Sequence, residues 1–160
     1  MRKARRTTLF VLMALLVLSI STSALPALAC DGDCCPSKCR PVGTPGYWMN
    51  HPDAWPVDEI KVGGVLYAKD QAIAIMKDPV KRDKTYTMFP ALVAAMLNGY
   101  HNCDGYKSCI KDTVAQANRW IEHYGFGVKA SSPAWQVKGE PLYWALDAYN
   151  NGELCAPSRD

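Results

Sequence analysis

The sequence predicts a mainly α-helical, disulfide-tied single domain with about four helices and one short β-hairpin. Apolar residues recur at helical spacing over several segments, and short alternating runs flank a Gly-Gly pair. All seven cysteines follow an apolar N-terminal leader. The chain of 160 residues has room for one domain of ordinary size.

Residues 1–29 have the pattern of a signal peptide. Basic residues precede the apolar run at 9–20, and residues 27–29 (ALA) give a small-x-small cleavage site. The apolar run is too short for a comfortable membrane span. We therefore expect export to the extracellular space or the cell envelope. Residues 30–42 would then form a cysteine-rich arm, and residues 43–160 a single globular helical domain.

Removal of the leader changes the charge of the chain. Four of the 18 basic residues lie in the leader, which leaves 14 against 15 acidic residues and a net charge of about −1. A nucleic-acid partner would need a basic face, so none is expected. No later segment is apolar and long enough to predict a transmembrane span, and the sequence indicates no cofactor.

Cysteines in an exported chain are usually paired. The predicted disulfide cysteines are Cys34, Cys35, Cys39, Cys103, Cys109 and Cys155. Cys109 is the favoured partner of Cys155, because a bridge from a long helix would anchor the C-terminal tail. The sequence leaves the connectivity open.

Cys30 makes the number of cysteines odd, and two accounts of it stay open. It is either the lipidated residue of a lipoprotein, or it follows ordinary cleavage and one thiol stays free or joins a partner. Ordinary secretion is slightly favoured, since Pro26 is unusual in a lipidation signal. The cysteine cluster at 30–39 also resembles a soft-metal site, but bridges are favoured over metal in an oxidising compartment.

Residues 43–56 (GTPGYWMNHPDAWP) form a rigid segment rich in proline and aromatic residues. Its prolines and glycines predict turns and no long helix or strand. Such a segment either closes a small core or grips a ligand. The predicted ligand-binding residues are Tyr47, Trp48, Asn50, His51 and Trp55.

The pattern TPGYW-x-NHP-x-AWP is followed by a GG hairpin, a helix, TMFPALVAA and a final NNG-x-LCAP. This order resembles an uncharacterised domain found in secreted bacterial proteins. The resemblance covers most of residues 43–160, and it departs at the cysteine-rich stretch and at Met49, where a basic residue is expected. It implies export and a compact domain, and it transfers no activity.

The first regular elements follow this segment. Residues 60–67 predict a hairpin around Gly63-Gly64, because glycine accepts the positive φ of a tight turn. Residues 69–77 predict a short helix that Pro79 stops.

Three further helices are expected. Residues 88–97 (MFPALVAAML) are apolar all round, which predicts a central buried helix with Thr87 as its cap, Pro90 in its first turn and Gly99 at its end. A stripe of apolar residues between Asp104 and Gly125 predicts one face of a core helix. Residues 125–138 predict an irregular loop with one turn at Ser132-Pro133. Residues 141–151 predict a last helix, closed by Asn151-Gly152.

Candidate catalytic groups are few. His51 and Asp53 lie two apart in a turn and could form a general base, although an imidazole in a turn more often bonds a backbone carbonyl. His123 is expected on the surface near a helix C-terminus, and His101 has no evident partner. The tryptophans and tyrosines could form a stacking platform for a polymer, but a core role is favoured.

The sequence therefore favours an exported, non-catalytic module of the cell envelope or extracellular space that binds a surface ligand or partner. One alternative is a small secreted hydrolase that uses His51 and Asp53. The other is a metal-binding protein built on the N-terminal cysteine cluster.

Overall fold

The computed structural model describes residues 40–101 and 104–158. Three groups of predictions lie outside these residues: the signal peptide at 1–29, the N-terminal cysteines, and Cys103. The N-terminal cysteines concerned are Cys30, Cys34, Cys35 and Cys39.

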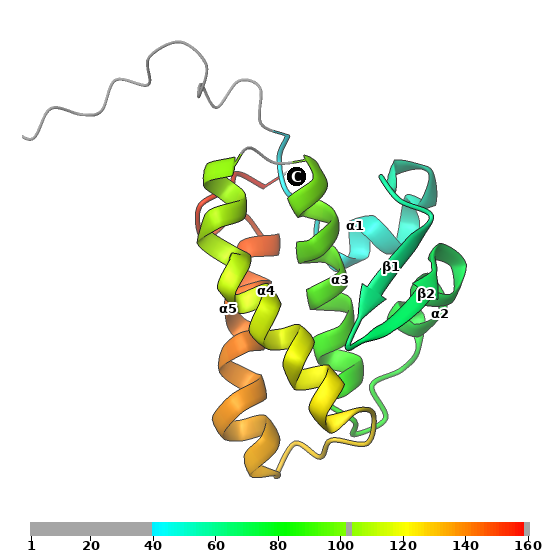
Figure 1. The fold of residues 1–160 in the computed structure, drawn as a ribbon, viewed down its shortest axis with the longest axis vertical. Coiled ribbons are helices and arrows are strands. Elements are labelled where there is room, and N and C mark those ends of the chain that lie inside the picture. The colour runs from blue at the N-terminus through cyan, green and yellow to red at the C-terminus, as the bar shows by residue number, and fades with distance from the viewer. Residues whose placement is uncertain (1–39, 102–103, 159–160) are drawn as a thin grey trace, which may run out of the picture.

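Helix α3 (Thr85–His101) is the centre of the fold. It contacts α1 (Pro45–Asn50), β1 (Glu59–Val62), α2 (Lys69–Lys77), α4 (Asp104–Tyr124) and α5 (Glu140–Asn150). Figure 1 shows α3, α4 and α5 side by side, with α4 running opposite to the other two, and the β-hairpin, α1 and α2 on the other side of α3. The predicted class, mainly α with one hairpin, is confirmed.

The predicted burial of α3 on every side is confirmed. Its buried apolar residues are Met88, Phe89, Ala91, Leu92, Val93, Ala94, Ala95 and Leu97. Burial of one Val, Leu, Phe or Met side chain contributes about 1.5–3 kcal/mol. This one helix therefore supplies eight of the 24 buried apolar residues in the described part of the chain.

The predicted ends of α3 are wrong at both termini. The helix begins at Thr85, three residues before the predicted start, and Asp83 Oδ1 accepts a hydrogen bond from Thr85 N at 2.9 Å at this end. Pro90 consequently lies inside the helix, where it has no N–H to donate. Gly99 does not end the helix, which continues to His101. Glycine inside a helix costs only about 0.5–1 kcal/mol relative to alanine, so a helix can continue through it.

The predicted hairpin is confirmed. β1 pairs antiparallel with β2 (Val65–Ala68), and the connecting Gly63 and Gly64 have φ of +56° and +81°. Both central residues need positive φ, which glycine adopts without steric cost. Ile60 and Val62 point from β1 into the core.

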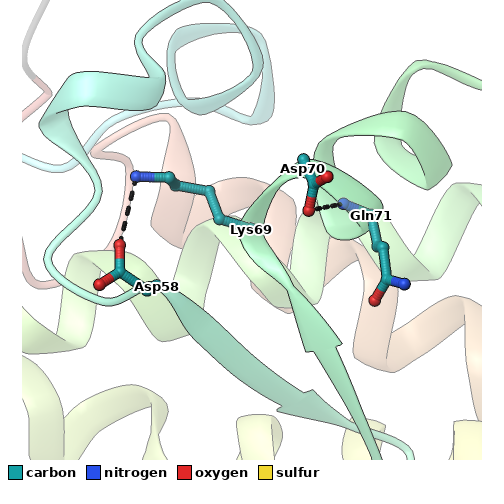
Figure 2. Close-up of polar contacts among 4 residues, drawn as sticks. All are labelled: Asp58, Lys69, Asp70 and Gln71. Carbon is teal, nitrogen blue, oxygen red and sulfur yellow. Dashed lines mark hydrogen bonds and ion pairs between the residues drawn. The ribbon is translucent and has the colours of Figure 1, made fainter.

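The start of α2 is fixed by short-range polar contacts that Figure 2 shows in part. Lys69 N donates to Asp58 O at 2.8 Å, and Lys69 Nζ forms an ion pair with Asp58 Oδ1 at 3.5 Å. Asp70 Oδ1 accepts from Gln71 N at 2.9 Å, while Gln71 Oε1 accepts from Ala68 N at 3.0 Å. An exposed ion pair contributes only about 0–1 kcal/mol to stability. The main effect of these contacts is therefore to fix where α2 begins and how it leaves β2. The predicted bounds of the helix are confirmed.

The expectation of an irregular loop at 125–138 is wrong for its second half. The π-helix η3 (Ala134–Gly139) runs directly into α5. Ser132 Oγ accepts from Trp135 N at 3.3 Å, and the Trp135 ring packs edge-on against Trp120 at 6.0 Å between centroids. The segment packs against α4 through this contact, which local sequence rules do not include.

The two ends of the described chain lie together. Val42 N donates to Pro157 O at 2.9 Å, and Val42 pairs with Ser158 in a parallel bridge. The favoured Cys109–Cys155 disulfide is present, with its Cα atoms 6.6 Å apart. Among the described helices, none combines the length and the apolarity that a bilayer span requires.

Candidate functional site

The rigid segment at 43–56 folds as two short helical turns. Thr44 Oγ1 accepts a hydrogen bond from Tyr47 N at 3.1 Å and caps α1, whose first residue is Pro45. The 3₁₀ turn η2 (Pro52–Ala54) follows directly. The prediction of turns without a long element is confirmed.

Two of the predicted ligand-binding residues lie in the core. Trp48 is 0% exposed and Trp55 is 7% exposed. Both indole N–H groups are used internally: Trp48 Nε1 donates to Asn98 Oδ1 at 3.1 Å, and Trp55 Nε1 donates to Trp48 O at 2.9 Å. These rings therefore hold the segment to α3 and present almost no face to a ligand.

Asn98 is the polar residue that locks this segment in place. Its Oδ1 also accepts from Gly43 N at 2.7 Å, and its Nδ2 donates to Gly43 O at 2.9 Å and to Asn150 Oδ1 at 3.0 Å. Asn150 Nδ2 in turn donates to Ala91 O at 2.9 Å. Sequence reasoning missed both asparagines, although Asn98 directly follows the apolar run of α3, where a buried amide needs partners.

The other predicted residues of the segment lie at the surface. Asn50, His51 and Asp53 are exposed, and Tyr47 is half-buried. The His51 ring stacks on Tyr47 at 4.3 Å, and His51 Nδ1 donates to Tyr47 O at 2.8 Å, as expected for an imidazole in a turn. A carbonyl oxygen only accepts, so the neutral ring has its lone pair on Nε2. No hydrogen bond or ion pair of the described residues joins His51 to Asp53.

A second site lies between α4 and the η3–α5 segment. It is an open groove of about 620 Å³, which we call the α4–α5 groove. Its principal lining residues are Arg119, His123 and Tyr124 from α4, and Val137, Lys138 and Leu142 from η3 and α5. This volume lies within the range of about 300–1,000 Å³ that is typical of ligand sites.

The groove depends on the close approach of η3 to α4. A Cβ atom at Gly139 would lie 2.8 Å from both Trp120 Cζ2 and Trp135 Cε3, so only glycine fits without rearrangement. Trp120 Nε1 donates to Ala134 O at 2.8 Å and ties the start of η3 to α4. Val137 is left 70% exposed on the outer side of the π-helix. π-Helical turns of this kind are frequent at functional sites.

The charge of the α4–α5 groove differs from that of the whole domain. Arg119, His123 and Lys138 line it, and its lining residues include no carboxylate. Lys138 Nζ lies 5.9 Å from the centre of the Tyr124 ring, a distance that allows a cation–π contact. The groove is thus a local basic site on a chain whose residues 30–160 have a net charge close to zero.

The predicted aromatic platform is not assembled on one face. Trp135 and Tyr149 are buried, whereas Trp144 is 59% exposed and Tyr143 is half-buried. Burial raises the pKa of the Tyr143 phenol, and the charge of Asp147 and its hydrogen bond from the phenol raise it further. Tyr143 is therefore a neutral donor under ordinary conditions.

Sequence reasoning placed His123 correctly at the surface but did not see the groove. Trp120 and Tyr124 belong to the predicted apolar stripe of α4, and their ring edges also border this hollow. The available signal was Arg119 and His123 four residues apart, which places two basic groups on one helix face. Their partner Lys138 lies on another element, which no local pattern could reveal.

Comparison with known proteins gives no match to any family model, curated protein or solved structure. The resemblance to a secreted bacterial domain therefore stays a prediction. Within residues 40–101 and 104–158, no three His, Cys, Asp or Glu side chains are grouped so that they could hold a metal ion.

Proposed function

We propose that the protein is an exported, non-catalytic module of the cell envelope or extracellular space that binds a surface ligand or partner. The α4–α5 groove is the observation that carries this proposal. It places exposed apolar side chains beside the cationic side chains of Arg119 and Lys138 in one open hollow. Exposed aromatic and arginine side chains are enriched at contact sites.

The chemistry of the lining favours binding over catalysis. The groove offers a guanidinium, an ammonium, an imidazole and apolar surface, and its lining includes no carboxylate, thiol, serine or threonine. General acid–base and nucleophilic mechanisms usually combine such a group with the imidazole. The groove residues recognise charge and shape instead.

Export is part of the proposal and is supported by the pattern of the leader. The Cys109–Cys155 disulfide agrees with it, because structural disulfides persist mainly in oxidising compartments. The intact mass of the protein from its producing cells tests this part. We expect loss of residues 1–29, with or without a lipid on Cys30; retention of the leader would contradict export.

The binding role can be tested by sedimentation of the mature protein with the envelope fraction of its producing cells. Val137→Glu places a negative charge in the groove, and Val65→Glu makes the same change on the hairpin, where Val65 is 52% exposed. We expect Val137→Glu to reduce sedimentation strongly and Val65→Glu to leave it unchanged. Equal sedimentation of both variants and the wild type would contradict the groove as the binding surface.

His51 carries a second candidate function, the small hydrolase. Its Nδ1 contact with Tyr47 O orients the ring and leaves Nε2 as an acceptor, which is the arrangement that a general base requires. This candidate predicts that His51→Ala retains the melting temperature and abolishes hydrolysis of an ester or glycoside substrate. An unchanged hydrolysis rate in His51→Ala would exclude it.

A further inference from the structure

We infer that the α4–α5 groove binds an acidic glycan, a polymer of sugar rings that carry carboxylate or phosphate groups. The inference rests on the proposed binding function and names the class of ligand for the same site. Three properties of the groove lead to it: its unbalanced positive charge, its apolar and aromatic walls, and its open shape.

The positive charge of the groove favours an anionic ligand. Arg119 and Lys138 approach the groove from its two sides, and both side chains are exposed. Neither has a carboxylate partner in the described ion pairs, so both can pair with a ligand. A guanidinium binds carboxylate and phosphate through two parallel hydrogen bonds, whereas an ammonium acts as a point charge. The pair therefore suits oxyanions spaced along a ligand.

The walls of the groove favour a ligand that has flat apolar surface beside its anionic group. Tyr124 and Leu142 are half-buried, and Val137 is largely exposed, so the groove presents ring and aliphatic surface to solvent. The Trp120 indole lies buried beneath this wall, and its Nε1 already donates to Ala134 O. A sugar ring has one such flat face of C–H groups together with polar edges, and it can lie on this wall while its acidic substituent meets a cation.

The shape selects a polymer. The hollow is open to solvent, unlike the pockets that bury most of a small ligand. A single small molecule would leave most of its surface in water and bind weakly. A chain of repeated units can lie in an open hollow and make further contacts beyond its rim.

Titration of the mature protein with derivatives of one polymer tests this inference. The probes are carboxymethyl dextran, phosphorylated dextran, unmodified dextran, and polyglutamate of similar charge density. Binding is followed by tryptophan fluorescence and by calorimetry at low salt. We expect one or both charged dextrans to bind, and the preferred one identifies the acidic group. Binding should weaken as salt is added, because the ion contacts are screened.

Matched variants connect that binding to the groove. Arg119→Gln/Lys138→Gln removes both cations, and Lys61→Gln/Lys77→Gln removes two exposed cations from β1 and α2. We expect the groove variant to bind the charged dextran roughly tenfold or more weakly, and the control variant to bind as the wild type does. Both variants should keep the wild-type melting temperature, since all four side chains are exposed.

Several outcomes would overturn the inference. They are no binding of either charged dextran, equal binding of unmodified dextran, equal loss in the control variant, and polyglutamate binding as tightly as the charged dextrans, which would indicate an acidic polypeptide. Envelope sedimentation separates these failures from failure of the proposed function. If sedimentation still depends on Val137, only the glycan assignment fails; if it does not, the groove itself is not the binding surface.

Discussion

Asn98 and Asn150 are joined side chain to side chain inside the core, with Asn98 Nδ2 donating to Asn150 Oδ1 at 3.0 Å. Both residues are at most 1% exposed. Together they connect α3, α5 and the start of the rigid segment at Gly43. A hydrogen-bonded polar pair thus sets the relative position of three parts of a mainly apolar core.

Asn98→Ala should destabilise the protein by about 3–5 kcal/mol. The substitution removes the hydrogen bonds of Asn98 to the Gly43 backbone, to Trp48 Nε1 and to Asn150 Oδ1, and each buried group left unsatisfied costs about 1–3 kcal/mol. Chemical denaturation measures the free energy of unfolding. Asn151→Ala, at the exposed residue next to Asn150, is the control and should change it by less than about 0.5 kcal/mol.

Trp48→Ala should cost about 3–5 kcal/mol, because a large buried ring is replaced by a cavity. Trp144→Ala removes a ring that is 59% exposed and should cost less than about 1 kcal/mol. Thermal unfolding of the two variants compares them directly. Similar melting temperatures would mean that Trp48 is not the core residue that its burial indicates.

Gly139→Ala and Gly99→Ala should change stability in opposite directions. The new methyl group at residue 139 meets the Trp120 and Trp135 rings and should cost about 1–3 kcal/mol. The methyl group at residue 99 has no neighbour within 4 Å and lies in a helix, so it should stabilise by about 0.4–1 kcal/mol. Denaturant melts of both variants check the prediction. Destabilisation by both would show that helix geometry, not the ring contact, sets the cost.

The raised pKa of Tyr143 predicts a loss of stability at high pH. Burial is the largest cause of the shift, followed by the charge of Asp147 and its hydrogen bond. Between pH 10.0, the ordinary pKa of tyrosine, and the higher native pKa, the folded protein keeps a proton that the unfolded chain has released. The free energy of unfolding therefore falls as the pH rises through this interval, and the contribution of Tyr143 is fully present below it.

Asp147→Asn should lower the native pKa of Tyr143 and reduce this loss of stability. An ultraviolet titration of phenolate, taken as the difference between each protein and its Tyr143→Phe variant, measures the pKa. An unchanged pKa in Asp147→Asn would show that burial alone causes the shift.

The sequence predicted those features that depend on neighbours along the chain. Gly63 and Gly64 fixed the hairpin because a two-residue turn needs positive φ at both positions. The apolar run at 88–97 indicated a helix buried on every side, since no face of it is polar. The Cys109–Cys155 bridge followed from the need to anchor a tail to a helix.

Other features depend on contacts between distant residues and were not predictable. η3 packs against α4 through Trp135 and Trp120, and the α4–α5 groove exists because Gly139 lets these rings approach. The aromatic segment could be read as either core or surface, and the side chain that places it in the core, Asn98, lies 50 residues from Trp48. Patterns read from a single sequence carry no information about contacts between residues so far apart in the chain.

The pairing of Val42 with Ser158 places both ends of the described chain at the same end of the domain. Figure 1 shows the C-terminal end of the domain beside the start of α4, while the last turns of α4 and the start of α5 lie at the opposite end. α4 has 21 residues, a length of about 30 Å. A bead, a fused reporter or a sensor surface attached next to Val42 or Ser158 would therefore sit at the end of the domain opposite to the α4–α5 groove.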